Sequence, residues 1–275
     1  MLMVLDFNSE MPDDAHDSKH VLRAHYKPLR PAGRFQGEEV VVARYAESIA
    51  EVFPDWINRC RLDGNMYNPF DLNMPVRVPQ RENMKSAYQS DPPISEVGRI
   101  MAQIFARELV TRNAVPKAIY TSPALACVQT AADIRNFIGA ECGNIHIEPG
   151  FAGDKSGQSN WMSPKQFVQL KYNVDENYTP ENEGNMKKLL EKLAEQKKGV
   201  MLVITDASAL QTLSDKSGGG DEKSSKNAFP AMSSIVLMRK DNNVEPSRLY
   251  MRPLTMIGRS TRRDIEISTD ANARS

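Results

Sequence analysis

The sequence predicts an α/β protein, with a mostly parallel sheet flanked by helices. Two observations carry this prediction: short continuous apolar runs are typical of strands covered on both faces, and these runs alternate with longer amphipathic segments. Strands are predicted at 40–43, 118–120, 145–147, 200–205, 234–238 and 249–251, and helices at 95–109, 125–138, 185–196 and 206–213.

The first strand candidate, Val40–Ala43, is uniformly apolar and runs directly into Arg44-Tyr45. A polar stretch at 53–92 follows, rich in Pro, Asn and Asp, and is predicted to be a long irregular excursion. Loops of this length inside a compact domain are usually functional or pack as an insert.

The next segment predicts a helix that begins at Ser95, because a serine hydroxyl is a favourable N-cap. Its apolar residues are Val97, Ile100, Met101, Ile104 and Leu109. Their spacing is close to the helical period, so these side chains are expected to form the buried stripe. The later helix at 185–196 is predicted to be amphipathic with a basic outer face.

Composition excludes several classes of protein. The 275 residues contain 35 basic and 35 acidic side chains, so no charge excess points to nucleic acid or to an acidic membrane surface. Cys60, Cys127 and Cys142 have no paired spacing and suit a reducing compartment. No apolar run is long enough to span a bilayer, and the N-terminus does not resemble a signal peptide. A cytoplasmic protein is expected, with the nucleus equally compatible.

The domain organisation is predicted from the polar ends. Residues 1–37 are expected to be a disordered tail, 38–256 the folded domain, and 257–275 a second disordered tail. A glycine-rich stretch at 217–226 is expected to be a flexible loop. His16 and His20 have the spacing of metal ligands on a helix, but no cluster completes a site, so neither a metal nor another cofactor is predicted.

Parallel sheets place functional side chains at the carboxyl ends of their strands. This rule is expected to bring together Arg44-Tyr45, the turn from Ser122 to Ala126, Glu148 and Asp206. The candidate pocket therefore holds one cation, one phenol and two carboxylates.

Several blocks of sequence are specific enough to suggest a family. They are Trp56-Ile57-Asn58-Arg59-Cys60, Val78-Pro79-Gln80-Arg81, Asp91-Pro92-Pro93-Ile94-Ser95, Ser122-Pro123-Ala124-Leu125-Ala126-Cys127 and Ile147-Glu148-Pro149-Gly150. In this order they resemble the histidine phosphatase superfamily, which has the phosphoglycerate mutase-like fold. Within it they resemble the branch of the suppressor-of-T-cell-receptor-signalling phosphatases and the insect steroid-phosphate phosphatases. The resemblance covers 38–256.

The resemblance implies roles for single residues. In active members a histidine after the first arginine is the nucleophile, a second histidine and further arginines hold the phosphoryl group, and a carboxylate donates a proton. By this resemblance Arg44 matches the first arginine and Glu148 the proton donor. The positions that depart are Tyr45 for the nucleophile, Ser48 and Ala126 for two arginines, and Asp206 for the second histidine.

These departures change the chemistry of the pocket. A phenol with an ordinary pKa near 10 is a poor nucleophile, and two lost arginines together with an added carboxylate should repel phosphate. We expect Tyr45 to fill the vacated space and to hydrogen-bond to Glu148 or Asp206, and Arg44 to pair with the same carboxylates. Alternatives are a metal bound by the two carboxylates, or Tyr45 as a covalent nucleophile.

The sequence thus predicts a catalytically inactive pseudophosphatase that acts through protein–protein interaction or as a scaffold. The alternative is a phosphatase with residual or altered phosphomonoester hydrolase activity, and a third hypothesis is a module that binds a small ligand other than phosphate. Unidentified protein partners are expected, and the resemblance implies that a homodimer is plausible. His146, two residues before Glu148, is expected to share its sheet face and to be structural.

Overall fold

The computed structural model describes residues 40–62, 66–181, 186–195, 199–215, 229–239, 249–254 and 265–266. The tail predicted at 1–37 and the loop predicted at 217–226 lie outside these residues. Of the tail predicted at 257–275, only 265–266 are described, and they form a short strand that the prediction did not include.

The described strands form one sheet in the order β3-β2-β4-β1-β5-β6-β7. Their bounds are β1 Val40–Arg44, β2 Ala118–Thr121, β3 Ile145–Ile147, β4 Met201–Thr205, β5 Ser234–Arg239, β6 Leu249–Leu254 and β7 Ile265–Glu266. The pairs among β3, β2, β4 and β1 are parallel, whereas β5, β6 and β7 extend the sheet by antiparallel pairing. The predicted α/β fold, with a parallel sheet flanked by helices, is confirmed.

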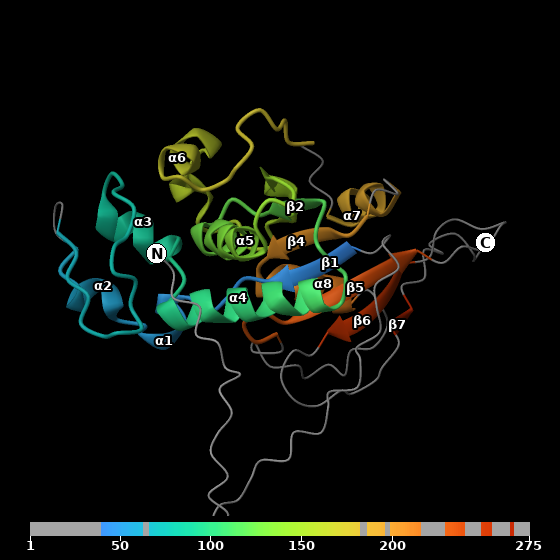
Figure 1. Ribbon diagram of the computed structural model, residues 1–275. Helices are drawn as coiled ribbons and strands as arrows, with labels where there is room; N and C mark the ends of the chain where they lie inside the picture. The colour runs from blue at the N-terminus through green and yellow to red at the C-terminus, as the bar shows by residue number, and fades with distance from the viewer. Residues whose placement is uncertain are drawn as a thin grey trace, which may run out of the picture. The chain divides into compact units, whose positions relative to one another are not determined.

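The helices match the predicted alternation (Figure 1). They are α1 Ile49–Val52, α2 Trp56–Arg59, α3 Met84–Ser90, α4 Glu96–Thr111, α5 Leu125–Ile138, α6 Pro164–Gln169, α7 Met186–Glu195 and α8 Ala207–Asp215, with the 3₁₀ turns η1 Pro149–Phe151 and η2 Gln158–Asn160. The bounds of α5 and β3 are those expected from the sequence.

Strand β1 separates two hydrophobic cores because successive side chains of a strand point to opposite faces. Val41 and Ala43 belong to the core that contains residues of α4 and α5. Val40 and Val42 belong to the core formed with α7, α8 and η1. A strand buried on both faces needs the continuous apolar run that the sequence shows.

Helix α4 buries only part of the predicted stripe: Leu109 is 1% exposed, as expected, and Met101 packs against the core. Ser95 caps it as expected, accepting a 2.9 Å hydrogen bond from the backbone N–H of Gly98. However, Val97, Ile100 and Ile104 are 43%, 55% and 47% exposed, and the buried side includes small residues such as Ala102. Gly98 explains why this side of the helix is buried. A Cβ at position 98 would lie 2.3 Å from the backbone oxygen of Glu47, so the helix can approach Glu47 this closely only with a glycine there.

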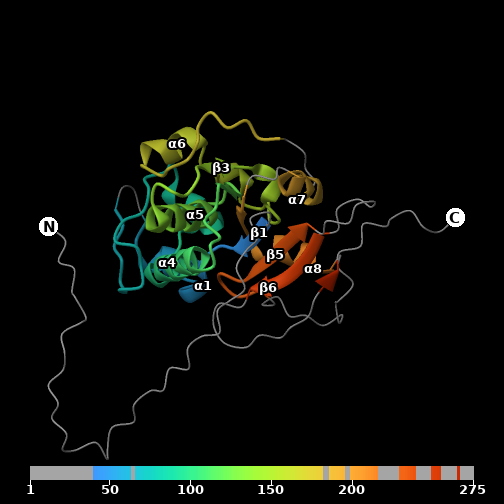
Figure 2. The same ribbon diagram turned by 45° about the vertical axis from the view of Figure 1, so that its right-hand side comes forward.

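The excursion at 53–92 is a packed insert with two short helices rather than an irregular loop. Trp56 of α2 and Tyr88 of α3 are fully buried, and their rings meet edge to face with centroids 5.9 Å apart. Figures 1 and 2 show α2, α3 and α6 grouped at one end of the sheet, and in Figure 1 this is the end toward which the arrowheads of β1 and β4 point. The insert thus borders the edge where the candidate site lies.

Within the part of the chain that the structure describes, none of the helices has the length and apolarity needed to cross a membrane.

Candidate functional site

Backbone hydrogen bonds join the carboxyl ends of four parallel strands in sequence. The N–H of Glu148 donates to Thr121, that of Ser122 to Ile204, and that of Tyr45 to Thr205, at 2.8, 3.0 and 2.9 Å. The segments after β3, β2, β4 and β1 therefore lie along one edge of the sheet. This confirms the predicted grouping of the strand ends, although it does not make every side chain meet.

Arg44 is buried in an ion pair that the sequence interpretation missed. Its side chain is 9% exposed, one Nη pairs with Glu51, and the other donates a 3.0 Å hydrogen bond to the backbone oxygen of Phe229. Its Nε is buried and has no hydrogen-bond partner. The Nε therefore faces no solvent, and the guanidinium lies beside the ring of Tyr45.

Glu51 also holds the chain just after β1. Its Oε2 accepts hydrogen bonds from the backbone N–H and the hydroxyl of Ser48, at 2.8 and 3.1 Å. Ser48, which stands where the resemblance expects an arginine, is 2% exposed and is the N-cap of α1. A Ser-x-x-Glu pattern is the sequence signal of a capping box and could have identified Glu51.

Tyr45 is half-buried and packs against the core on the α4 and α5 side. The Cζ of Arg44 lies 4.8 Å from the centroid of its ring. Burial raises the pKa of the Tyr45 phenol above its ordinary value of 10.0, while the positive charge of Arg44 opposes the rise and the nearby Asp206 adds to it. A phenol in this environment stays protonated at neutral pH.

Asp206 has its carboxylate engaged by backbone donors. One oxygen accepts from the N–H groups of Gly153 and Asp154 at 2.8 and 3.1 Å, and the other from Ala209 at 3.0 Å and from the hydroxyl of Ser208 at 2.6 Å. This carboxylate therefore ties the start of α8 to the loop after η1. An anion at a helix N-terminus is favoured by the unpaired N–H groups there.

Glu148 is buried, with 1% exposure, and accepts three hydrogen bonds. The donors are the hydroxyl of Tyr178 and the N–H of Glu181, both at 2.9 Å, and the N–H of Gly150 at 3.1 Å. His146 stands on the same side of the sheet, with its ring centroid 4.7 Å from that of Tyr178, as expected from its register. Burial lowers the pKa of His146, although Asp175 opposes this shift.

The polar network predicted for the pocket is not the one that forms. Arg44 pairs with Glu51 instead of Glu148 or Asp206, and each of these two carboxylates has its own donors. The physical reason is that hydroxyl and backbone N–H donors, some of them distant in the chain, already satisfy both carboxylates without the Arg44 guanidinium. Ala126 is 5% exposed in the first turn of α5, and its backbone oxygen accepts from the hydroxyl of Thr130 at 2.7 Å.

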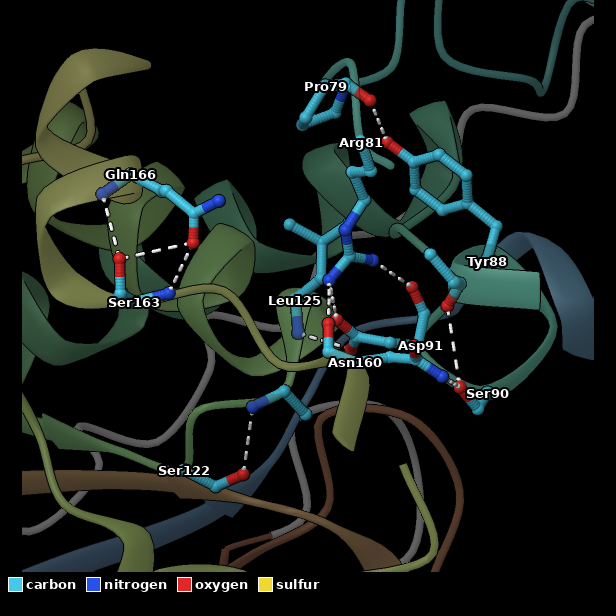
Figure 3. A network of polar contacts seen from close by, with 12 residues as sticks. Pro79, Arg81, Tyr88, Ser90, Asp91, Ser122, Leu125, Asn160, Ser163 and Gln166 are labelled. Atoms are coloured by element: carbon cyan, nitrogen blue, oxygen red, sulfur yellow. Dashed lines mark hydrogen bonds and ion pairs between the residues drawn. The ribbon is translucent and has the colours of Figure 1, made fainter. Parts of the chain in front are cut away.

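A second buried ion pair connects the insert to the Ser122–Ala126 turn (Figure 3). Arg81 pairs with Asp91 at 2.7 Å, and their side chains are 5% and 1% exposed. The other oxygen of Asp91 accepts a 2.6 Å hydrogen bond from the N–H of Leu125, the first residue of α5. Arg81 also donates to the backbone oxygen of Asn160, so the insert and the segment at Asn160 meet at this guanidinium. The start of α5 is therefore held by the insert.

Among the described residues, no group of three or more His, Cys, Asp or Glu side chains could hold a metal ion. The sequence alternative of a metal at Asp206 and Glu148 finds no third ligand there.

The family model of the histidine phosphatase superfamily (branch 1) matches residues 78–242. The chain belongs to the histidine phosphatase superfamily. It is 28% identical to an ecdysteroid-phosphate phosphatase of Drosophila melanogaster, over 78% of the chain and 31% of that relative. It is 31% identical to a ubiquitin-associated and SH3 domain-containing protein A of Mus musculus, over 51% of the chain and 24% of the relative.

The chain thus spans less than a third of the length of these curated relatives. Among solved structures it resembles the ecdysone phosphate phosphatase of Bombyx mori in complex with tungstate, with a TM-score of 0.59 and 21% identity, covering 82% of the chain and 96% of that structure. This likeness shows the fold. The branch suggested by the sequence blocks is confirmed by these relatives.

The prediction of a catalytically inactive pseudoenzyme is contradicted by the same comparisons. Relatives from two insects are named as ecdysteroid-phosphate phosphatases, and the matching structure is that of a phosphatase. The error came from treating changed catalytic residues as proof of lost activity.

Proposed function

We propose that this domain is a phosphatase with altered phosphomonoester hydrolase activity, working without a histidine nucleophile. Membership of the family and relatives named as phosphatases support a phosphate ester as the substrate class. The observation that carries the proposal is the guanidinium of Arg44 at the carboxyl edge of the sheet, where the residue matches the first arginine of the family. A phosphate oxygen is the kind of acceptor that such a donor recognises.

Water replaces the missing nucleophile in this proposal. Its oxygen forms the new bond to phosphorus as the ester P–O bond breaks, Asp206 takes the proton of the water, and Glu148 delivers a proton to the leaving oxygen. Tyr45 is protonated and does not attack, because burial raises the pKa of its phenol. The products are an alcohol and inorganic phosphate.

The altered machinery implies slow turnover. Ser48 and Ala126 provide no charge at positions where the family has arginines, and the loss of one oxyanion-stabilising donor typically lowers kcat by about 10²- to 10³-fold. Asp206 is engaged by four donors and adds negative charge near the incoming ester. Activity is therefore expected on reactive aryl phosphates before alkyl phosphates.

The test is hydrolysis of an aryl phosphate by the purified chain and by Arg44→Lys, which keeps the charge but loses the forked donor. Arg112→Gln is the matched control, since Arg112 also pairs with a carboxylate, that of Glu108, at the far end of α4. Turnover should fall about 10²-fold in Arg44→Lys and stay unchanged in the control. Equal turnover in the parent and Arg44→Lys would show that a contaminant or another site is responsible.

Two further variants separate the possible nucleophiles. Tyr45→Phe should keep its activity if water attacks, and should lose it if the phenol forms a covalent intermediate. Glu148→Gln should slow alkyl esters more than aryl esters, because an aryl oxide leaves without a proton. Binding of protein partners and formation of a homodimer remain proposals based on the resemblance, and sedimentation velocity tests the second.

A further inference from the structure

We propose that a small cavity beside Glu148 binds a methylated ammonium group. The cavity has a volume of about 100 Å³ and lies between the end of β3, the segment at 178–181 and α7. That is the space of about three water molecules at ~30 Å³ each, so it suits a compact group and not a ring-bearing ligand. This site shares Glu148 with the hydrolase proposal, and its other lining residues have no part in the proposed reaction.

Three aromatic rings provide walls of this cavity. Tyr120 packs edge to face against Phe151 and against Tyr178, with centroid distances of 6.3 and 6.0 Å and interplanar angles of 70° and 74°. Rings at such steep angles to one another do not stack. Aromatic faces attract cations, most strongly where water is excluded.

The charged groups of the cavity favour the same sign of ligand. Two carboxylates, Glu148 and Glu181, line it against one ammonium, that of Lys192. Glu148 is buried, and three donors fix the position of its carboxyl group. An anionic ligand would face two like charges in a confined space, whereas a cation would face opposite charge.

The ammonium group of Lys192 lies at this site. Its Nζ pairs with Glu181, and the side chains of Lys192 and Glu181 are 52% and 30% exposed. Ion pairs with this much exposure contribute little to stability, so an incoming cation can compete with the lysine for the carboxylate of Glu181. Two leucines of α7 complete the lining, and apolar walls favour a weakly hydrated methylated ammonium over a bare ammonium ion or an alkali cation.

The test is calorimetric or NMR titration of the full chain with choline, and with 3,3-dimethylbutan-1-ol as its uncharged isostere, at fixed ionic strength. Choline should bind saturably, and the isostere should bind about 5-fold or more weakly. A parallel titration with free ε-N-trimethyllysine distinguishes a small-molecule source of the ammonium group from a modified protein side chain. Equal binding of choline and its isostere, or no saturable binding of either cation, would overturn the proposal.

Two conservative variants at the exposed rim test the charges without disturbing the core. Glu181→Gln should weaken choline binding by about 5-fold, since it removes a carboxylate but keeps the size of the side chain. Lys192→Gln should strengthen it by about 2-fold or more, because the competing ammonium is removed. A variant that merely damaged the fold would not tighten binding, so weaker binding by both variants would also count against the site.

Discussion

The hydroxyl of Tyr178 donates a 2.9 Å hydrogen bond to the buried carboxylate of Glu148. The two residues are separated by 30 positions in the chain, and the bond joins the end of β3 to the segment that leads toward α7. Burial and the neighbouring carboxylate raise the pKa of Tyr178 above its ordinary range. The phenol therefore acts as a hydrogen-bond donor at neutral pH.

Replacing Tyr178 by phenylalanine should lower the free energy of unfolding by about 1–3 kcal/mol, because a buried carboxylate loses one of its donors. Urea denaturation measures this loss. Tyr67→Phe is the matched comparison, since the hydroxyl of Tyr67 donates at 2.8 Å to a neutral backbone oxygen, that of Pro75, and its removal should cost only about 0.5–1.5 kcal/mol. A smaller loss for Tyr178→Phe than for Tyr67→Phe would contradict the inference that the buried carboxylate of Glu148 depends on this donor.

Asp133 makes stability depend on pH in an unusual direction. Burial raises the pKa of its carboxyl from 3.8 to about 6, and one of its oxygens is buried without a hydrogen-bond partner. Arg99, with its Nε at 3.9 Å, opposes this rise only in part. Because the folded protein holds this proton more tightly than the unfolded chain, stability decreases as the pH rises from about 4 to about 6.

Asp133→Asn should remove this dependence. The variant and the parent should be close in stability near pH 3.5, and the variant should be more stable by about 2–3 kcal/mol at pH 7. The difference between the two denaturation curves across pH isolates this carboxyl from all others. A parent that gains stability relative to the variant as the pH rises would show that the ion pair with Arg99 prevails over burial.

Gly98→Ala should destabilise the protein by about 1–3 kcal/mol, although alanine is the better helix former by about 1 kcal/mol. The added Cβ would lie 2.3 Å from the backbone oxygen of Glu47, which also accepts the N–H of Ser95 at 2.8 Å. Thermal denaturation measures the effect. Gln103→Ala, on the exposed side of the same helix, should have little effect, and similar losses at both positions would rule out a close approach at Gly98.

Restoring the family residues should raise phosphatase activity on this fold. A triple variant with Tyr45→His, Ala126→Arg and Asp206→His returns a nucleophile and two phosphate-binding groups to the carboxyl edge. We expect kcat/KM on an aryl phosphate to rise by at least about 10²-fold, with an acid-labile phosphoenzyme that the parent does not form. Adding Arg44→Lys to the triple variant should reverse most of the gain. A folded triple variant with unchanged activity would show that the edge is no longer arranged to bind phosphate.

Much of the fold could be predicted because its signals are local. The uniformly apolar run Val40–Ala43 indicates a strand covered on both sides, and Ser95 indicates a helix start, without reference to the rest of the chain. The carboxyl-end rule likewise placed Arg44 and Asp206 on one edge. The exposure of Val97 and Ile100 in α4 could not be predicted, since both are apolar and the close approach at Gly98, which turns the helix toward Glu47, is visible only in the folded protein.

The sequence alone determined the alternation of the main strands and helices, the family and the identity of the groups along the edge, because periodicity and motif spacing are written in consecutive residues. Only the tertiary structure decided the partners of those groups: Arg44 with Glu51, Asp91 with both Arg81 and Leu125, and Glu148 with Tyr178. Each pairing depends on which short-range donors and acceptors surround a buried charge. A buried charge is stabilised by the donors closest to it in space, and segments far apart in the chain come within that range only after folding.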